Sequence, residues 1–264
     1  MTDPTNTPSL TPLPPAANAA QALDHEKQLA AAVAVGWVRD GMTLGLGTGS
    51  TAAHFIRQLG ARARAGGLRV RGTATSLASE ALAREVGIPL VEPRRGLRFD
   101  LAVDGADELD AGLRLIKGGG GALLREKIIE TAADYLLVIA DSSKLVARLG
   151  AFPLPLEVVP FALPWVLDAV AALGGAPVLR MGKTDPAQPA LSDQHNLLVD
   201  CHFGEISDPG ALALRLQAIP GVAGHGLFLG LARAALLVQD GQVRVLRPGQ
   251  PARPASEFEA LPGK

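Results

Sequence analysis

The chain has 264 residues, of which 48% are hydrophobic and 19% charged, and its formal net charge is −1. A large core can form, and the near-neutral charge argues against nucleic acid as the main partner. The single cysteine, Cys201, excludes a disulfide framework, favours a reducing compartment and is expected to be a small core residue. There is neither an apolar run of membrane-spanning length nor a secretion signal, so we expect a cytoplasmic protein without a membrane partner.

The first chemical signal is the glycine-rich sequence GLGTGST at 45–51. Before it, residues 1–20 are expected to be a disordered extension, and a helix is expected at 22–38. The glycines lie between an apolar strand and a helix, where backbone N–H groups and the positive helix end can hold an anion. The dinucleotide and Walker patterns both fail, because Ser50 occupies the third glycine position and no lysine precedes it. A plain turn is the alternative.

Apolar strands then alternate with helical segments, which predicts a Rossmann-like parallel sheet with helices on both faces. The expected strands span 43–46, 69–75, 88–91, 101–103 and 135–140. Ligands of such sheets bind beyond the carboxyl ends of the strands. The polar clusters expected at that edge are 48–51, Ser76, 104–107 and Lys144.

The stretch LAVDGADELDAGLRLIKGGGGALLR, at 101–125, concentrates groups that can move protons on a small anionic substrate. Asp104 ends a strand and Asp107 follows it, while Lys117 precedes four glycines that lead into a helix carrying Glu126. Carboxylates serve as acid and base, and a lysine and backbone N–H groups stabilise an oxyanion. From the residues alone, Glu126 is equally well an exposed helix residue, and Asp107 a turn or cap residue.

The remaining chain predicts a second unit inserted into the first. Between 151 and 224 the elements follow the order βαββαβ, the ferredoxin-like split motif. A hairpin at 234–246 is expected to return to the first sheet. We therefore expect a Rossmann-like catalytic domain formed by 21–150 and 225–250, a ferredoxin-like domain at 151–224, and a loose tail at 251–264.

Four sequence blocks in this order resemble ribose-5-phosphate isomerase, type A. They are GLGTGSTAAHFI, DLAVDGADELD, IKGGGGALLREKII and IADSSKLVARLGAFPLPLEVVP, and the likeness runs from about Lys27 to Arg247. The resemblance implies an aldose–ketose isomerase that interconverts D-ribose 5-phosphate and D-ribulose 5-phosphate without a metal or cofactor. It also implies a homodimer or a dimer of dimers. The binding partner that it implies is a small sugar phosphate. Gly121 departs from the family, where alanine is common.

The resemblance also assigns roles position by position. Glu126 matches the proton-accepting glutamate, and Asp104 and Lys117 complete the implied catalytic set. An enediolate needs one base to move a proton between C2 and C1, and donors for the charge that develops. Lys144 matches a substrate-binding lysine, whereas Lys27 is a weaker match. The implied substrate-binding residues are Thr48, Gly49, Ser50, Thr51, Asp104, Gly105, Ala106, Asp107, Lys117, Gly118, Gly119, Gly120, Lys144 and Lys27.

Two other functional classes are weighed against this interpretation. An amino-sugar-phosphate deaminase or lactonase on a related fold would need a catalytic histidine, but His54 follows the first glycine loop and the other candidates lie in the second unit. A sugar-phosphate-sensing regulator would need a helix-turn-helix segment with a basic recognition helix, which residues 1–20 do not provide. Conversion of ribose 5-phosphate to ribulose 5-phosphate, without ammonia release or DNA binding, would separate the three.

Overall fold

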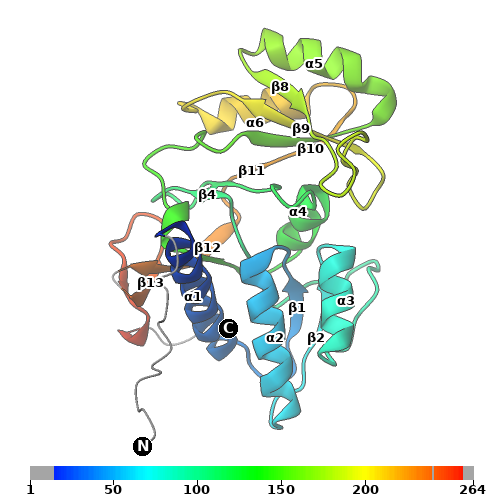
Figure 1. Cartoon of the computed structure of the whole chain (residues 1–264). Coiled ribbons are helices and arrows are strands. Elements are labelled where there is room, and N and C mark those ends of the chain that lie inside the picture. Colours follow the sequence, from blue (N-terminus) through cyan, green and yellow to red (C-terminus); the bar gives the residue numbers. More distant parts are fainter. Residues whose placement is uncertain (1–14, 240, 258–264) are drawn as a thin grey trace, which may run out of the picture.

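The computed structural model describes residues 15–239 and 241–257, and it is an α/β protein with three sheets (Figure 1). The helices are α1 (Pro15–Gly36), α2 (Ser50–Arg64), α3 (Leu77–Glu85), α4 (Leu123–Thr131), α5 (Leu163–Ala172) and α6 (Pro209–Gln217), with the 3-10 helices η1 (Ser142–Lys144), η2 (Pro160–Ala162) and η3 (Ala255–Glu257). None of the helices in these ranges is long and apolar enough to cross a membrane.

The largest sheet has seven strands in the order β14-β13-β12-β6-β3-β1-β2. These strands are β1 (Thr43–Leu46), β2 (Arg71–Ala74), β3 (Leu101–Asp104), β6 (Leu136–Ala140), β12 (Ala232–Gln239), β13 (Gln242–Leu246) and β14 (Arg253–Pro254). The five from β12 to β2 are parallel, and β13 and β14 add antiparallel. The central strands β1, β3 and β6 are buried along their whole length, as expected for a sheet covered on both faces. The Rossmann-like prediction is confirmed.

The second sheet confirms the predicted ferredoxin-like motif. Its strands β7 (Leu154–Val158), β8 (Ala176–Leu179), β9 (Leu197–His202) and β10 (Val222–His225) pair antiparallel in the order β10-β7-β9-β8. Helices α5 and α6 belong to this upper part of the molecule (Figure 1). A separate hydrophobic core forms here, and Cys201 is buried in it as expected.

A small third sheet of β4 (Glu108–Leu109), β5 (Leu115–Ile116) and β11 (Leu227–Phe228) lies between the other two (Figure 1). The chain passes from the second sheet to this one at Gly226, between β10 and β11. The Gly226 N–H donates to Pro155 O at 2.7 Å, and its carbonyl accepts from Lys117 N at 2.9 Å. A Cβ at Gly226 would lie 2.3 Å from Lys117 O, so only glycine fits this crossing.

Three expectations need correction. The segment at 88–91 forms only an isolated bridge between Leu90 and Gly72, and Pro89 and Pro93, which lack an N–H donor, restrict its pairing. Helix α1 begins at Pro15, so the end of the extension expected at 1–20 is helical, while residues 1–14 lie outside the described residues. Part of the tail expected to be loose forms β14 and η3, and residues 258–264 are again outside the description.

Candidate active site

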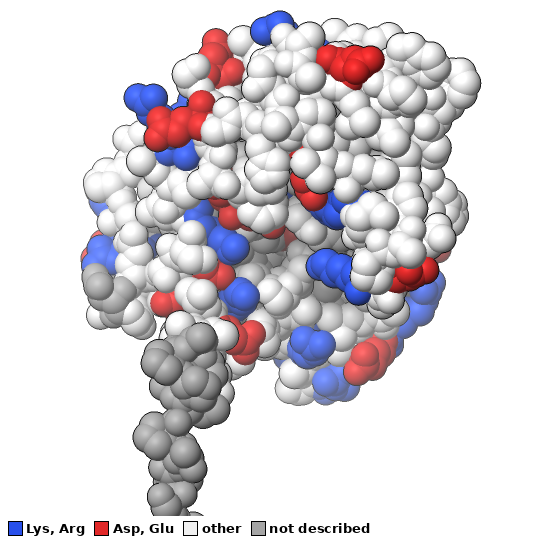
Figure 2. All heavy atoms as spheres, turned by 45° about the horizontal axis from the view of Figure 1, so that its top comes forward, with Lys and Arg blue, Asp and Glu red and all other residues white. Residues whose placement is uncertain are grey.

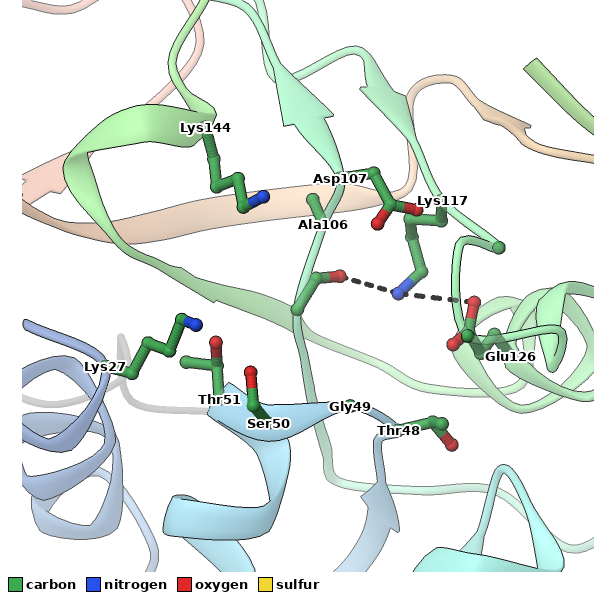
Figure 3. Close-up of a pocket in the computed structure, with 13 residues that line it drawn as sticks. Lys27, Thr48, Gly49, Ser50, Thr51, Ala106, Asp107, Lys117, Glu126 and Lys144 are labelled. Atoms are coloured by element: carbon green, nitrogen blue, oxygen red, sulfur yellow. Dashed lines mark hydrogen bonds and ion pairs between the residues drawn. The ribbon is translucent and has the colours of Figure 1, made fainter. Parts of the chain in front are cut away.

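A cavity of about 140 Å³ lies beyond the carboxyl ends of the parallel strands, where the sequence predicts a ligand (Figure 3). The residues that line it are Lys27, Thr48, Gly49, Ser50, Thr51, Gly105, Ala106, Asp107, Lys117, Gly118, Gly120, Glu126 and Lys144. All thirteen were predicted from the sequence. The two remaining candidates, Asp104 and Gly119, do not line the cavity; Asp104 is buried and Gly119 is half-buried. Figure 2 shows a face that is hollowed near its middle, with both basic and acidic side chains around the hollow.

One end of the cavity is formed by the glycine loop between β1 and α2. Gly49 has a φ of 98°, a left-handed conformation that favours glycine, and α2 begins at the next residue. No side chain among the described residues caps α2, so the N–H groups of Ser50 and Thr51 remain available to an anion. The side chains of Lys27 and Lys144 extend towards the same space (Figure 3). This end can therefore hold a phosphate group.

Thr48 contributes to the loop differently from its neighbours. Its hydroxyl lies 2.6 Å from that of Thr75 and 2.8 Å from that of Ser76, and 3.3 Å from that of Ser79. Ser76 caps α3, because its side chain accepts from Ser79 N. The Thr48 hydroxyl thus holds the loop against the start of α3 and is not directed at the phosphate end.

The other end of the cavity is organised around Lys117, which is 2% exposed. Its Nζ lies 3.2 Å from Asp104 Oδ2, 3.5 Å from Glu126 Oε2 and 3.2 Å from Glu130 Oε1. The ammonium also donates to Gly105 O at 2.6 Å. One buried cation therefore faces three buried carboxyl groups, a concentration of charge that costs stability and is typical of a functional site.

The neighbouring carboxyl groups are fixed by backbone donors. Asp104 Oδ1 accepts from Thr48 N at 2.9 Å and from Gly105 N at 2.6 Å. Asp107 lines the cavity, and its Oδ2 accepts from Gly119 N at 2.7 Å. Asp104 thus links the glycine loop to the lysine cluster, while Asp107 holds the glycine turn that precedes α4.

Burial dominates the electrostatics of the cluster. Burial raises the pKa of Glu126 to about 8, against the opposing effect of Lys117, and the charges of Asp104 and Asp107 add to the increase. For Lys117, burial alone would lower the pKa, but the three carboxylates outweigh it and the pKa rises well above its usual value. The positive end of α4 favours the ionised form of Glu126, but desolvation outweighs that field and raises its pKa.

Two residues of the site were missed by the sequence reasoning. Glu130 lies one turn after Glu126, and this four-residue spacing on a helix was the signal that could have found it. Arg180 comes from the ferredoxin-like part, where its guanidinium pairs with Asp200. It donates to Gly118 O at 3.1 Å and to Gly119 O at 3.3 Å, which ties the glycine turn to the second sheet. No local pattern predicted this long-range contact.

Comparison with known proteins identifies the family. The model of ribose 5-phosphate isomerase A (phosphoriboisomerase A) matches residues 71–242. The ribose-5-phosphate isomerase A of Roseiflexus castenholzii is 51% identical over 229 residues, which cover 85% of this chain and 97% of that protein. The solved ribose 5-phosphate isomerase A of Methanocaldococcus jannaschii is 41% identical, with a TM-score of 0.81 over 85% of this chain and 99% of that one.

A second solved structure, of D-ribose-5-phosphate isomerase in complex with phospho-erythronic acid, is 37% identical and has a TM-score of 0.82. It covers 85% of this chain and 99% of its own. The chain belongs to the ribose 5-phosphate isomerase A family.

Proposed function

We propose that this chain interconverts D-ribose 5-phosphate and D-ribulose 5-phosphate through an enediolate, with Glu126 as the base. The observation that carries this proposal is the position of Glu126 on the cavity wall, in the first turn of α4, with Lys117 Nζ 3.5 Å from its Oε2. A single carboxylate beside a fixed cation can remove a proton from one carbon and return it to the next. Lys117 and the N–H groups of the glycine turn stabilise the negative oxygens of the enediolate.

The two ends of the cavity suit the two ends of the substrate. The N-terminus of α2, with Lys144 and Lys27, binds the phosphate group, while the reacting carbons lie next to Lys117 and Glu126. The phospho-erythronic acid held by the related isomerase combines a phosphate with a carboxylic acid, which are the two kinds of anionic group that these ends would accept.

The position of Asp104 favours an indirect role. Both its carboxyl oxygens face other protein groups, and it does not line the cavity. Asp107 does line the cavity, so we assign the contacts with sugar hydroxyls, and proton transfer during ring opening, to Asp107. Asp104 instead positions the Lys117 ammonium against the substrate oxygens.

The test is a product assay. Ribose 5-phosphate should yield ribulose 5-phosphate, without release of ammonia and without DNA binding. Glu126→Gln keeps the size of the side chain but removes the base, and loss of a general base costs about 10²–10⁴-fold in rate. Glu85→Gln, at an exposed position at the end of α3, is the control and should retain wild-type kcat. Ammonia release or sequence-specific DNA binding without isomerisation would refute the proposal.

We also propose that the protein is a homodimer. Phe161 and Trp165 are 83% and 62% exposed, and their ring centroids are 5.5 Å apart, so they form an apolar surface that a second copy would cover. Sedimentation of the wild type should give twice the mass of one chain. The double variant Phe161→Glu with Trp165→Glu should give the mass of a single chain. A wild-type monomer at micromolar concentration would refute this.

We further propose a cytoplasmic location, supported by a single cysteine that is buried and unpaired. Fractionation of cells tests this location.

A further inference from the structure

Glu130 is a buried carboxyl group for which the reaction described above has no use. Its side chain is completely buried, one helical turn after Glu126 on α4. Among the described residues, neither of its oxygens has a hydrogen-bond partner, although Lys117 Nζ lies 3.2 Å from Oε1. A buried carboxylate without N–H donors is costly, so this side chain either carries a proton or destabilises the site.

The charges around Glu130 indicate which carboxyl group carries a proton. Asp104, Glu126 and Glu130 surround one Lys117, so three ionised carboxylates would leave a buried net charge of −2. The nearby Lys127 forms no ion pair with these carboxyl groups among the described residues: its Nζ donates to Leu227 O at 2.9 Å and lies over the Phe228 ring, 4.6 Å from its centroid. At least one carboxyl group of the cluster must therefore be neutral at rest.

The hydrogen bonds separate Asp104 from Glu130. Asp104 Oδ1 accepts from two backbone N–H groups, those of Thr48 and Gly105, whereas Glu130 accepts from none of the described residues. Asp104 Oδ2 also has no hydrogen-bond partner among the described residues. It lies 3.2 Å from Lys117 Nζ, as does Glu130 Oε1, so these two unpartnered oxygens border the same ammonium. Burial raises the pKa of Glu130 well above its usual value despite Lys117, and the charges of Asp104 and Glu126 raise it further.

We propose that Glu130 is a positioning residue that stays protonated during turnover and donates its proton to Asp104 Oδ2, so that Lys117 is shared only between Asp104 and the reacting groups. This inference rests on the proposed role of Glu126. With Glu130 neutral, the charges of Lys117 and Asp104 cancel, and Glu126 alternates between neutral and −1 as it carries the substrate proton. With Glu130 ionised, the cluster would alternate between −1 and −2, and the ammonium would be drawn away from the enediolate.

The test compares Glu130→Gln with Glu130→Leu in the full-length enzyme. Gln is a neutral donor like a protonated carboxyl group, so kcat should stay within about 3-fold of wild type and the acidic limb of the kcat/KM profile should not move. Leu removes the donor, so Asp104 competes for Lys117, kcat should fall about 10-fold or more and the acidic limb should shift to higher pH. If Glu130 served only for packing, the Gln and Leu variants would not differ in the position of the acidic limb.

A second measurement does not depend on activity or on the folding of the Leu variant. Isotope-edited infrared difference spectra of wild type minus Glu130→Gln should contain a protonated carboxyl band near neutral pH. Absence of that band, or an acidic limb in Glu130→Gln displaced to lower pH, would show that Glu130 is ionised and overturn the proposal. If instead Glu126→Gln retained full activity, the proposed base would fail, while the infrared result would still report on Glu130.

Discussion

Replacing Lys117 with Met tests the charge balance of the cluster most severely, because it removes the central cation and keeps much of its volume. Breaking a buried ion pair by removing one partner typically costs about 3–5 kcal/mol. Here the ammonium faces three carboxyl groups, and its loss also leaves Gly105 O without its donor. The carboxyl groups must then be buried either ionised or protonated.

The cost should depend strongly on pH. Unfolded carboxyl groups titrate near pH 4, so keeping one protonated in the folded state costs about 1.4 kcal/mol for each pH unit above that value. Groups whose pKa is raised by folding lose stability as pH rises, so the variant should be least affected in acid. We expect Lys117→Met to lower the free energy of unfolding by about 1–2 kcal/mol at pH 5.5 and about 3–5 kcal/mol at pH 8.

Urea unfolding of both proteins at the two pH values measures this difference, and each kcal/mol should correspond to roughly 2–4 °C in Tm. Lys144→Met is the matched control, because Lys144 lines the same cavity but forms no ion pair with a described residue. It should change stability by less than about 0.5 kcal/mol at either pH. Equal losses for Lys117→Met at pH 5.5 and pH 8, or a loss at pH 8 no larger than that of the control, would refute the reasoning.

Three further predictions concern the loop, the phosphate and the base. A Cβ on Gly47 would lie 2.3 Å from Asp104 Cγ, whereas one on Gly105 would meet nothing nearer than 3.8 Å. In urea unfolding, Gly47→Ala should therefore lower the free energy of unfolding by about 1–3 kcal/mol. Gly105→Ala should lower it by less than about 1 kcal/mol. Similar losses for both would contradict the packing described. Lys144→Ala should raise KM more than it lowers kcat, because it removes a contact with the phosphate group. Free ribose, which lacks this group, should be a very poor substrate. An unchanged KM in Lys144→Ala would show that Lys144 does not bind the phosphate. Because Glu126 must be ionised to act and has a pKa of about 8, kcat/KM should rise with pH through that value, and a profile already flat from pH 6 would contradict this.

The sequence predicted the local elements well because they follow from neighbouring residues. Strand, glycine turn and helix at 43–64 are successive, and the cap at Ser76 needs only its own helix. The carboxyl ends of parallel strands share one edge, so the topology alone brought Asp107 and Lys144 to one cavity.

What the sequence could not predict depends on contacts between distant segments. Asp104 and Asp107 were grouped as one motif, yet Asp104 lies behind Lys117 while Asp107 faces the cavity. Arg180 reaches the glycine turn from another sheet, and the degree of burial that raises the pKa of Glu126 exists only once both parts pack. Proximity along the chain carries no information about these properties.

The central claim is that Glu126 carries the proton between C2 and C1, and isotope exchange tests it directly. In deuterated water the wild type should incorporate some solvent deuterium at C1 or C2 during turnover, because a proton held on a carboxyl group can exchange before it is returned. Glu126→Gln should bind substrate but incorporate almost none. A Gln variant that turns over and exchanges like the wild type would contradict the account and move the base to Asp107 or Asp104.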